Sequence, residues 1–129
     1  MRPKNQGNIN NIVTDWHLGK VAKGKGRGGR LGFPTINLKL NYIDFSYGVY
    51  LCQALVDNAY YQGLLFYGPR LTFKETQATV ELFLINYNKT TKVNSRIKFK
   101  LGKLLRKVIK FSSKEALARQ IKRDLKAVN

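Results

Sequence analysis

A glycine-rich, basic stretch near the N-terminus, GKGRGGRLGFPTINL over residues 24–38, contains the residue types that bind phosphate. Glycines let backbone N–H groups approach phosphate oxygens closely and form an anion-binding nest. Four cations in and beside the stretch add positive charge, namely Lys23, Lys25, Arg27 and Arg30. Chemistry alone leaves two interpretations open, a phosphate cradle and an ordinary basic loop.

Two established phosphate motifs fit this stretch only in part. Gly19 to Lys25 reads G-x-x-x-x-G-K, but Gly26 stands where a P-loop has the Ser or Thr that binds Mg²⁺. Gly24, Gly26 and Gly29 have the G-x-G-x-x-G spacing of a dinucleotide site, but no βαβ unit follows them. We therefore reject both motifs.

Thr35 and Asn37 lie near the end of the same stretch, and Thr35 directly follows Pro34. They are two positions apart, so on an extended segment their side chains point the same way. A hydroxyl and an amide oxygen side by side suit Mg²⁺, which takes hard oxygen ligands and shares them with phosphates. The pair is thus a candidate site for a metal–phosphate complex.

Glu81 is the only charged residue in ATVELFLIN, residues 78–86. On a strand its face also carries Thr79, Phe83 and Ile85, which is not the composition of a solvated face. A lone carboxylate in such surroundings is either structural or placed to accept a proton as a general base.

Short β-rich runs with turns between them dominate the chain. We expect strands over residues 16–23, 47–56, 60–67, 78–86 and 95–101, with a tight hairpin turn at Asp57-Asn58. A helix closes the chain. Ser112 and Glu115 have capping-box spacing, and an apolar stripe follows at Leu117, Ile121 and Leu125. This order predicts a mainly β fold, a small barrel with an amphipathic C-terminal helix packed outside.

The chain has 129 residues, 43% of them hydrophobic, which is enough for one core. We expect a loose tail over 1–12 and a single domain over 13–129. Lys and Arg outnumber Asp and Glu by 24 to 7, a net charge of +17. Such charge attracts polyanions, although drift in base composition also produces it. We expect any nucleic-acid binding to be weak and non-specific.

Cysteine usage and hydropathy indicate the compartment. Cys52 is the only cysteine, so the chain forms no internal disulfide, which favours a reducing compartment. No apolar run is long enough to span a membrane, and the N-terminus lacks the pattern of a secretory signal. We expect a cytoplasmic monomer.

Four segments follow the glycine stretch along the chain: YGVY (47–50), YGPRLTF (67–73), VELFLIN (80–86) and LLRKVIKFSSKEALARQIKRD (104–124). Together with the glycine stretch, they resemble the riboflavin kinase family and come in that family's order. Gly24, Gly26, Arg27 and Gly28 match its G-x-G-R-G arch, and residues 32–37 match its G-F-P-T-x-N turn. The resemblance extends from about Gly19 to Asp124.

This resemblance implies a six-stranded antiparallel Greek-key barrel with the C-terminal helix outside. It implies transfer of the γ-phosphoryl group of ATP to the 5′-hydroxyl of riboflavin, giving FMN and ADP. The residues implied to bind the nucleotide phosphates are Gly24, Gly26, Arg27, Gly28, Thr35 and Asn37. Thr35 and Asn37 are also the implied Mg²⁺ ligands, Glu81 is the implied base, and Arg106 is implied to lie on the flavin side.

The chain departs from the family pattern at Phe66, Leu71, Lys107 and Ile109, and over residues 87–94. We expect these departures to lie near the flavin rather than at the Mg²⁺ turn. Two other functions stay open at this point. One is a non-catalytic module of the same fold that binds flavin or nucleotide, and the other is a basic barrel that binds RNA.

Overall fold

The structure is a computed structural model that describes residues 15–24 and 32–128. The predicted tail over 1–12 lies outside the described residues, as do Gly26, Arg27 and Gly28 of the predicted phosphate arch. The extent of the single domain over 13–129 stays a prediction.

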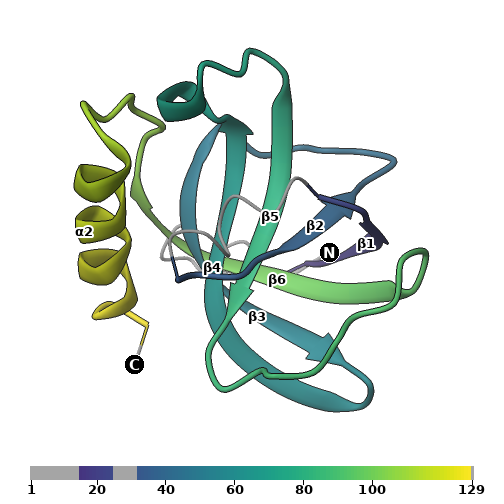
Figure 1. The fold of residues 1–129 in the computed structure, drawn as a ribbon. Helices are drawn as coiled ribbons and strands as arrows, with labels where there is room; N and C mark the ends of the chain where they lie inside the picture. Colours follow the sequence, from purple (N-terminus) through teal and green to yellow (C-terminus); the bar gives the residue numbers. More distant parts are fainter. Residues whose placement is uncertain (1–14, 25–31, 129) are drawn as a thin grey trace.

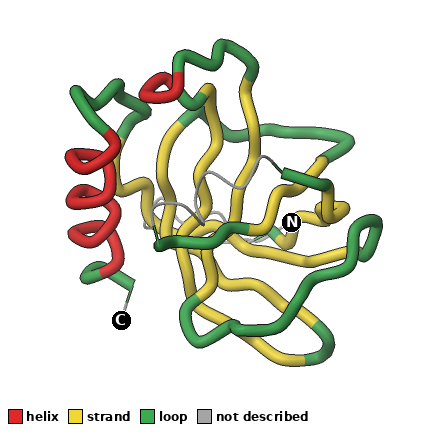
Figure 2. The backbone as a smooth tube through the Cα atoms, viewed as in Figure 1, coloured by secondary structure: helices red, strands yellow, loops and turns green. Residues whose placement is uncertain are grey.

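Six strands form a closed antiparallel barrel in the order β1-β2-β5-β4-β3-β6 (Figures 1 and 2). The strands are β1 (Trp16–Ala22), β2 (Ile36–Lys39), β3 (Gly48–Val56), β4 (Ala59–Pro69), β5 (Ala78–Leu84) and β6 (Arg96–Arg106). Successive hairpins join β3, β4 and β5, and β2 returns to lie beside β5, which makes a Greek key. The predicted six-stranded barrel is confirmed.

The barrel interior is filled by alternate residues of each strand, as the period of two requires. The inward residues include Val21, Leu38, Cys52, Leu65, Val80, Leu82, Ile97 and Phe99. Burial raises the pKa of the Cys52 thiol to about 12. Val80 and Leu82 point into the barrel, so Glu81 between them points outward. The candidate site around Glu81 must therefore lie on the outside of the barrel.

The turn between β3 and β4 is the predicted one. Asp57 and Asn58 both have positive φ, 50° and 67°, which is the backbone of a type I′ hairpin turn. Asn and Asp adopt this left-handed region more readily than most residues, so this local sequence sets the hairpin.

Helix α2 (Lys114–Leu125) lies outside the barrel, on the side away from β1 (Figure 1). The predicted capping residue was wrong by one position. Ser113, not Ser112, is the N-cap, and its hydroxyl accepts a hydrogen bond of 3.1 Å from the backbone N–H of Ala116. Ser113 has the extended backbone that a cap needs, and this register leaves Glu115 in the first turn instead of at the capping-box position.

The apolar stripe of α2 packs on the barrel as predicted. Leu125, with Val128 just after the helix, joins a small apolar cluster with Val49 of β3 and Leu64 of β4. Before the helix, the 3₁₀ turn η2 (Leu71–Phe73) follows β4. Among the described residues, no helix has the length and apolarity needed to cross a membrane.

Candidate active site

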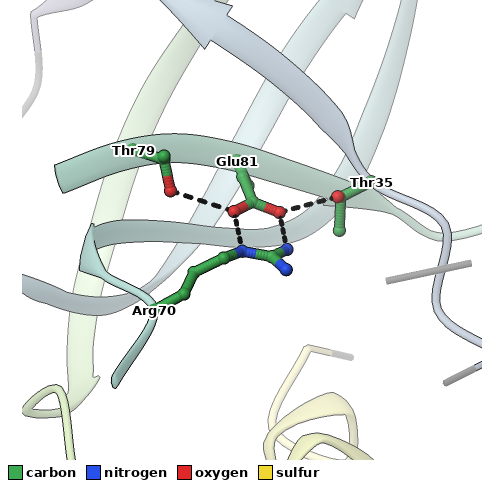
Figure 3. A network of polar contacts seen from close by, with 4 residues as sticks. All are labelled: Thr35, Arg70, Thr79 and Glu81. Atoms are coloured by element: carbon green, nitrogen blue, oxygen red, sulfur yellow. Dashed lines mark hydrogen bonds and ion pairs between the residues drawn. The ribbon is translucent and has the colours of Figure 1, made fainter. Parts of the chain in front are cut away.

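Glu81 lies at the centre of a buried polar network on the outer face of β5, with only 3% of its surface exposed (Figure 3). Thr79 Oγ1 donates to one carboxylate oxygen at 3.0 Å, and Thr35 Oγ1 donates to the other at 2.9 Å. Arg70 adds two hydrogen bonds, one from Nε and one from Nη2, each to a different carboxylate oxygen. The network joins the segment before β2, the end of β4 and strand β5.

The pairing of β2 with β5 explains why Thr35 reaches Glu81. Asn37 is the direct partner of Glu81 in the sheet, so both side chains lie on the outer face. Thr35 is two residues before Asn37 and lies on that face too. The structure therefore brings together Thr35, Asn37 and Glu81, three of the residues predicted from the sequence.

Arg70 is not among the site residues predicted from the sequence. Arg70 follows β4, and its two bonds to Glu81 form an ion pair. A signal was present, because Arg70 is one of only two cations in residues 44–88, and a buried carboxylate needs a charged partner. What the sequence lacks is the path of the chain that brings the two together.

An apolar cleft of about 110 Å³ lies between the barrel and α2, with Glu81 in its wall. Aromatic and aliphatic side chains make up most of the lining, including Phe33, Leu64, Phe66, Phe73, Phe83, Phe111, Leu117 and Ile121. Phe33 and Phe83 meet edge to face, with ring centroids 6.1 Å apart. The chemistry of this lining suits an apolar ring with a polar group directed at Glu81.

A second, more polar groove lies on the other side of Thr35. It is lined by Lys23, Gly24, Thr35 and Asn37, and by residues of the segment after β5, among them Asn86, Asn88 and Lys89. Thr35 and Phe83 line both the groove and the cleft. The two sites therefore meet at Thr35, next to the Glu81 carboxylate.

The Asn37 amide lies against the backbone of Gly24, so a larger residue at position 24 would displace this amide. A Cβ atom added to Gly24 would lie 1.8 Å from Asn37 Nδ2 and 2.5 Å from its Cγ. Two predicted phosphate-site residues are thus in direct contact, and the glycine leaves the space that the Asn37 side chain occupies.

The donor set at this junction fits a divalent cation that shares its coordination with phosphate. Thr35 and Asn37 offer a hydroxyl and an amide oxygen in the groove, which are hard ligands of the kind Mg²⁺ takes. Within residues 15–24 and 32–128, no group of three His, Cys, Asp or Glu side chains is placed to hold a metal.

Arg106, predicted on the flavin side, lines the apolar cleft, where it is bound to α2. Its Nε and Nη2 reach the buried Asp124 carboxylate at 3.0 and 2.9 Å, and Gln120 Nε2 donates to the same carboxylate at 2.9 Å. The Arg106 guanidinium also lies 5.5 Å from the centre of the Phe111 ring. Arg106 therefore fixes the helix that forms one wall of the cleft.

The structure separates the residues that depart from the family pattern. Phe66, Leu71 and Ile109 line the apolar cleft, whereas Lys107 lines neither the cleft nor the groove. Residues from Tyr87 to Val93 line the groove beside Asn37 instead. Their position differs from the expectation because the segment after β5 runs along the side of the barrel that carries β2.

Residues 16–129 match the family model described as Flavokinase: Riboflavin kinase. The chain belongs to the riboflavin kinase family. The trifunctional protein RibF/MnmA of Mycoplasmoides gallisepticum is 34% identical over 119 residues, which are 90% of this chain and 18% of that protein. The RNA-binding riboflavin kinase RibR of Bacillus subtilis is 33% identical over 114 residues, 85% of this chain and 48% of that protein.

A bifunctional riboflavin kinase/FMN adenylyltransferase of Bacillus subtilis is 35% identical over 111 residues, 82% of this chain and 35% of that protein. The chain described here thus spans less than half the length of each of these three relatives. A crystal structure described as a macrolide-efflux protein from Streptococcus pneumoniae has a similar fold. Its TM-score is 0.77 at 25% identity, over 88% of this chain and 38% of that one.

Proposed function

We propose that this chain is a riboflavin kinase that transfers the γ-phosphoryl group of MgATP to the 5′-hydroxyl of riboflavin, giving FMN and ADP. One observation carries the proposal. An apolar cleft and a polar groove meet at Thr35, beside a buried carboxylate, Glu81. Phosphoryl transfer between two bound substrates needs such a junction, because catalysis rests mainly on positioning and charge stabilisation.

The groove is the proposed nucleotide side. Lys23 and Lys89 supply positive charge along it, and Gly24 leaves room for the Asn37 amide in its wall. Gly26, Arg27 and Gly28, which lie outside the described residues, are further proposed phosphate-binding residues from their match to the family's glycine-rich motif. Thr35 and Asn37 would hold Mg²⁺, which when bound neutralises negative charge on the transferring phosphates.

The cleft is the proposed flavin side. An isoalloxazine ring is flat and largely apolar, and the cleft offers it the rings of Phe33, Phe83 and Phe111. Binding there would direct the ribityl chain toward Thr35 and Glu81. Arg106 contributes by holding α2, and with it Leu117 and Ile121, against the ring.

Glu81 is the proposed acceptor of the 5′-hydroxyl proton. As that proton moves to a carboxylate oxygen, the hydroxyl oxygen bonds to the γ-phosphorus, and the bond from this phosphorus to the oxygen that ADP retains breaks. A carboxylate has about four acceptor positions, and Glu81 uses them for Thr35, Thr79 and the two bonds from Arg70. The substrate hydroxyl must therefore replace one threonine donor, while Arg70 keeps the carboxylate in place.

We infer that one chain makes the complete site, since β2, β4, β5 and α2 of a single protomer supply the residues, and that the protein works as a cytoplasmic monomer. The proposal is limited to phosphoryl transfer. The adenylyltransferase and RNA-binding activities in the relatives' names belong to proteins of which this chain matches only a part.

The test is incubation of the purified chain with riboflavin, ATP and Mg²⁺, followed by chromatographic detection of FMN. We expect FMN only when all three are present. Flavin fluorescence measures riboflavin binding separately. A folded chain that binds riboflavin and MgATP but makes no FMN would establish the non-catalytic module instead.

A further inference from the structure

Outward-facing residues of four adjacent strands form a surface on the side of the barrel away from α2 (Figure 1). We call it the basic aromatic face, made of Trp16, Leu18, Lys20, Leu55, Tyr60, Arg96, Lys98 and Lys100. Strand pairing puts these residues on one face, because Trp16 pairs with Lys100, Leu18 with Lys98, Lys20 with Arg96, Leu55 with Lys98, and Leu55 with Tyr60. None of them lines the cleft or the groove.

The aromatic residues of this face are exposed and close to each other. Trp16 is 41% exposed and Tyr60 is 63% exposed. Their ring centroids are 6.2 Å apart, although strands β6 and β3 lie between theirs in the barrel. The Lys100 ammonium lies 5.3 Å from the centre of the Trp16 ring. A large apolar ring exposed beside a cation is a feature of surfaces that stack planar groups.

Lys20 lies between two other cations in the sheet. Lys20 pairs with Arg96 on one side and with Lys39 on the other. Like charges placed opposite each other in a sheet destabilise it. No ion pair among residues 15–24 and 32–128 involves these cations. The arrangement costs stability and favours binding of a polyanion.

We propose that the basic aromatic face binds single-stranded nucleic acid without sequence preference. The phosphates contact the Lys and Arg side chains, and unstacked bases stack on Trp16 and Tyr60. Stacking on exposed rings between cations is how non-specific single-strand binders work, and it needs bases that are free of a duplex. This binding is additional to the proposed kinase activity, and its surface is separate from the kinase site.

Trp16 reports on the proposal directly, because it is the only tryptophan in the chain. Its fluorescence is titrated with oligouridylate and oligoadenylate of about 12 nucleotides, a length within the range of single-strand sites. We expect quenching by both oligomers and little by a duplex of the same length. For three to five phosphate contacts, log K should fall against log salt with a slope of about −2 to −3.5.

Matched variants separate a defined surface from general charge. Binding of labelled oligomers by Trp16→Ala should weaken roughly 5- to 150-fold, the range for loss of a stacking ring. The double variant Lys98→Glu, Lys100→Glu should bind far more weakly than the double variant Arg119→Glu, Lys122→Glu. The second pair changes the net charge equally but lies on exposed positions of α2.

Thermal unfolding midpoints of all variants show whether each one is folded, and Trp16→Phe provides a milder change at the same position. Equal weakening by the two charge-reversal pairs would overturn the proposal, as would unchanged Trp16 fluorescence at saturating oligomer. The proposal would also be overturned if the protein bound a duplex as tightly as a single strand. Binding to anionic vesicles without binding to the oligomers would overturn it too.

Discussion

Glu81 and Arg70 form a two-bond ion pair in which Nε and Nη2 of the guanidinium each contact a separate carboxylate oxygen (Figure 3). The glutamate is 3% exposed and the arginine 16% exposed. This geometry fixes the plane of the carboxylate and leaves Thr35 and Thr79 to complete its hydrogen bonds. The pair therefore orients the proposed base before substrate arrives.

Removal of Arg70 alone should destabilise the protein strongly. Arg70→Met leaves the Glu81 carboxylate buried without its cation, and breaking a buried pair in this way costs about 3–5 kcal/mol. Urea denaturation measures the loss in the free energy of unfolding. The double variant Arg70→Met, Glu81→Leu should recover most of it, since no charge is then left buried. A single variant as stable as the wild type would show that the pair is not an important contact.

Thr35 and Thr79 make almost the same hydrogen bond to Glu81, but only Thr35 also lines the groove. Thr35→Val should weaken MgATP binding about 10-fold or more, the scale of a lost hydrogen bond or ligand contact to a charged group. Thr79→Val is the matched control and should leave MgATP affinity nearly unchanged. Calorimetric titration with MgATP compares them, and equal effects would place Thr35 outside the nucleotide site.

Gly24→Ala should impair nucleotide binding without unfolding the barrel. The new Cβ would displace the Asn37 amide, which is a flexible side chain and can move at little cost in stability. Gly102→Ala is the control, because a Cβ there makes only ordinary contacts of 3.5 Å with Leu51. Calorimetric titration should show weaker MgATP binding for Gly24→Ala alone. Normal affinity in that variant would mean that the position of Asn37 is not important for the nucleotide.

Asp124→Asn should loosen the helix that closes the cleft. It removes the charge that holds Arg106, at a cost of up to about 3 kcal/mol because Arg106 remains partly in water. Riboflavin binding, followed by flavin fluorescence, should weaken, while MgATP binding stays near normal. Gln120→Ala removes only a neutral donor to the same carboxylate and should have the smaller effect. Equal riboflavin affinity in both variants would contradict the assignment of the cleft to the flavin.

Patterns local in the chain predicted much of the fold and part of the site. Alternation on β5 placed Glu81 on one face with non-solvated neighbours, and the spacing of Thr35 and Asn37 placed both on one face. The Asp57-Asn58 turn followed from conformational preference alone. Each of these features depends on a few consecutive residues, which is why the sequence was sufficient.

The remaining site features depend on contacts across the closed barrel. Arg70 reaches Glu81 because β4 pairs with β5 and the chain then turns into η2. Arg106 meets Asp124 only where the end of β6 lies beside α2. The capping error was different in kind, because two adjacent serines both fit a cap and only the backbone shows which one is extended.

The most direct test of the account is the turnover of Glu81→Gln with riboflavin and MgATP. Gln keeps the size of the side chain but cannot accept the 5′-hydroxyl proton as a carboxylate does. A general base is worth about 10²- to 10⁴-fold in rate, so kcat should fall by that factor. Riboflavin and MgATP affinities should change little in protein shown by urea denaturation to be folded, because the lost interaction belongs to the transition state. A folded Glu81→Gln variant that makes FMN at close to the wild-type rate would contradict the account and leave Glu81 with a structural role only.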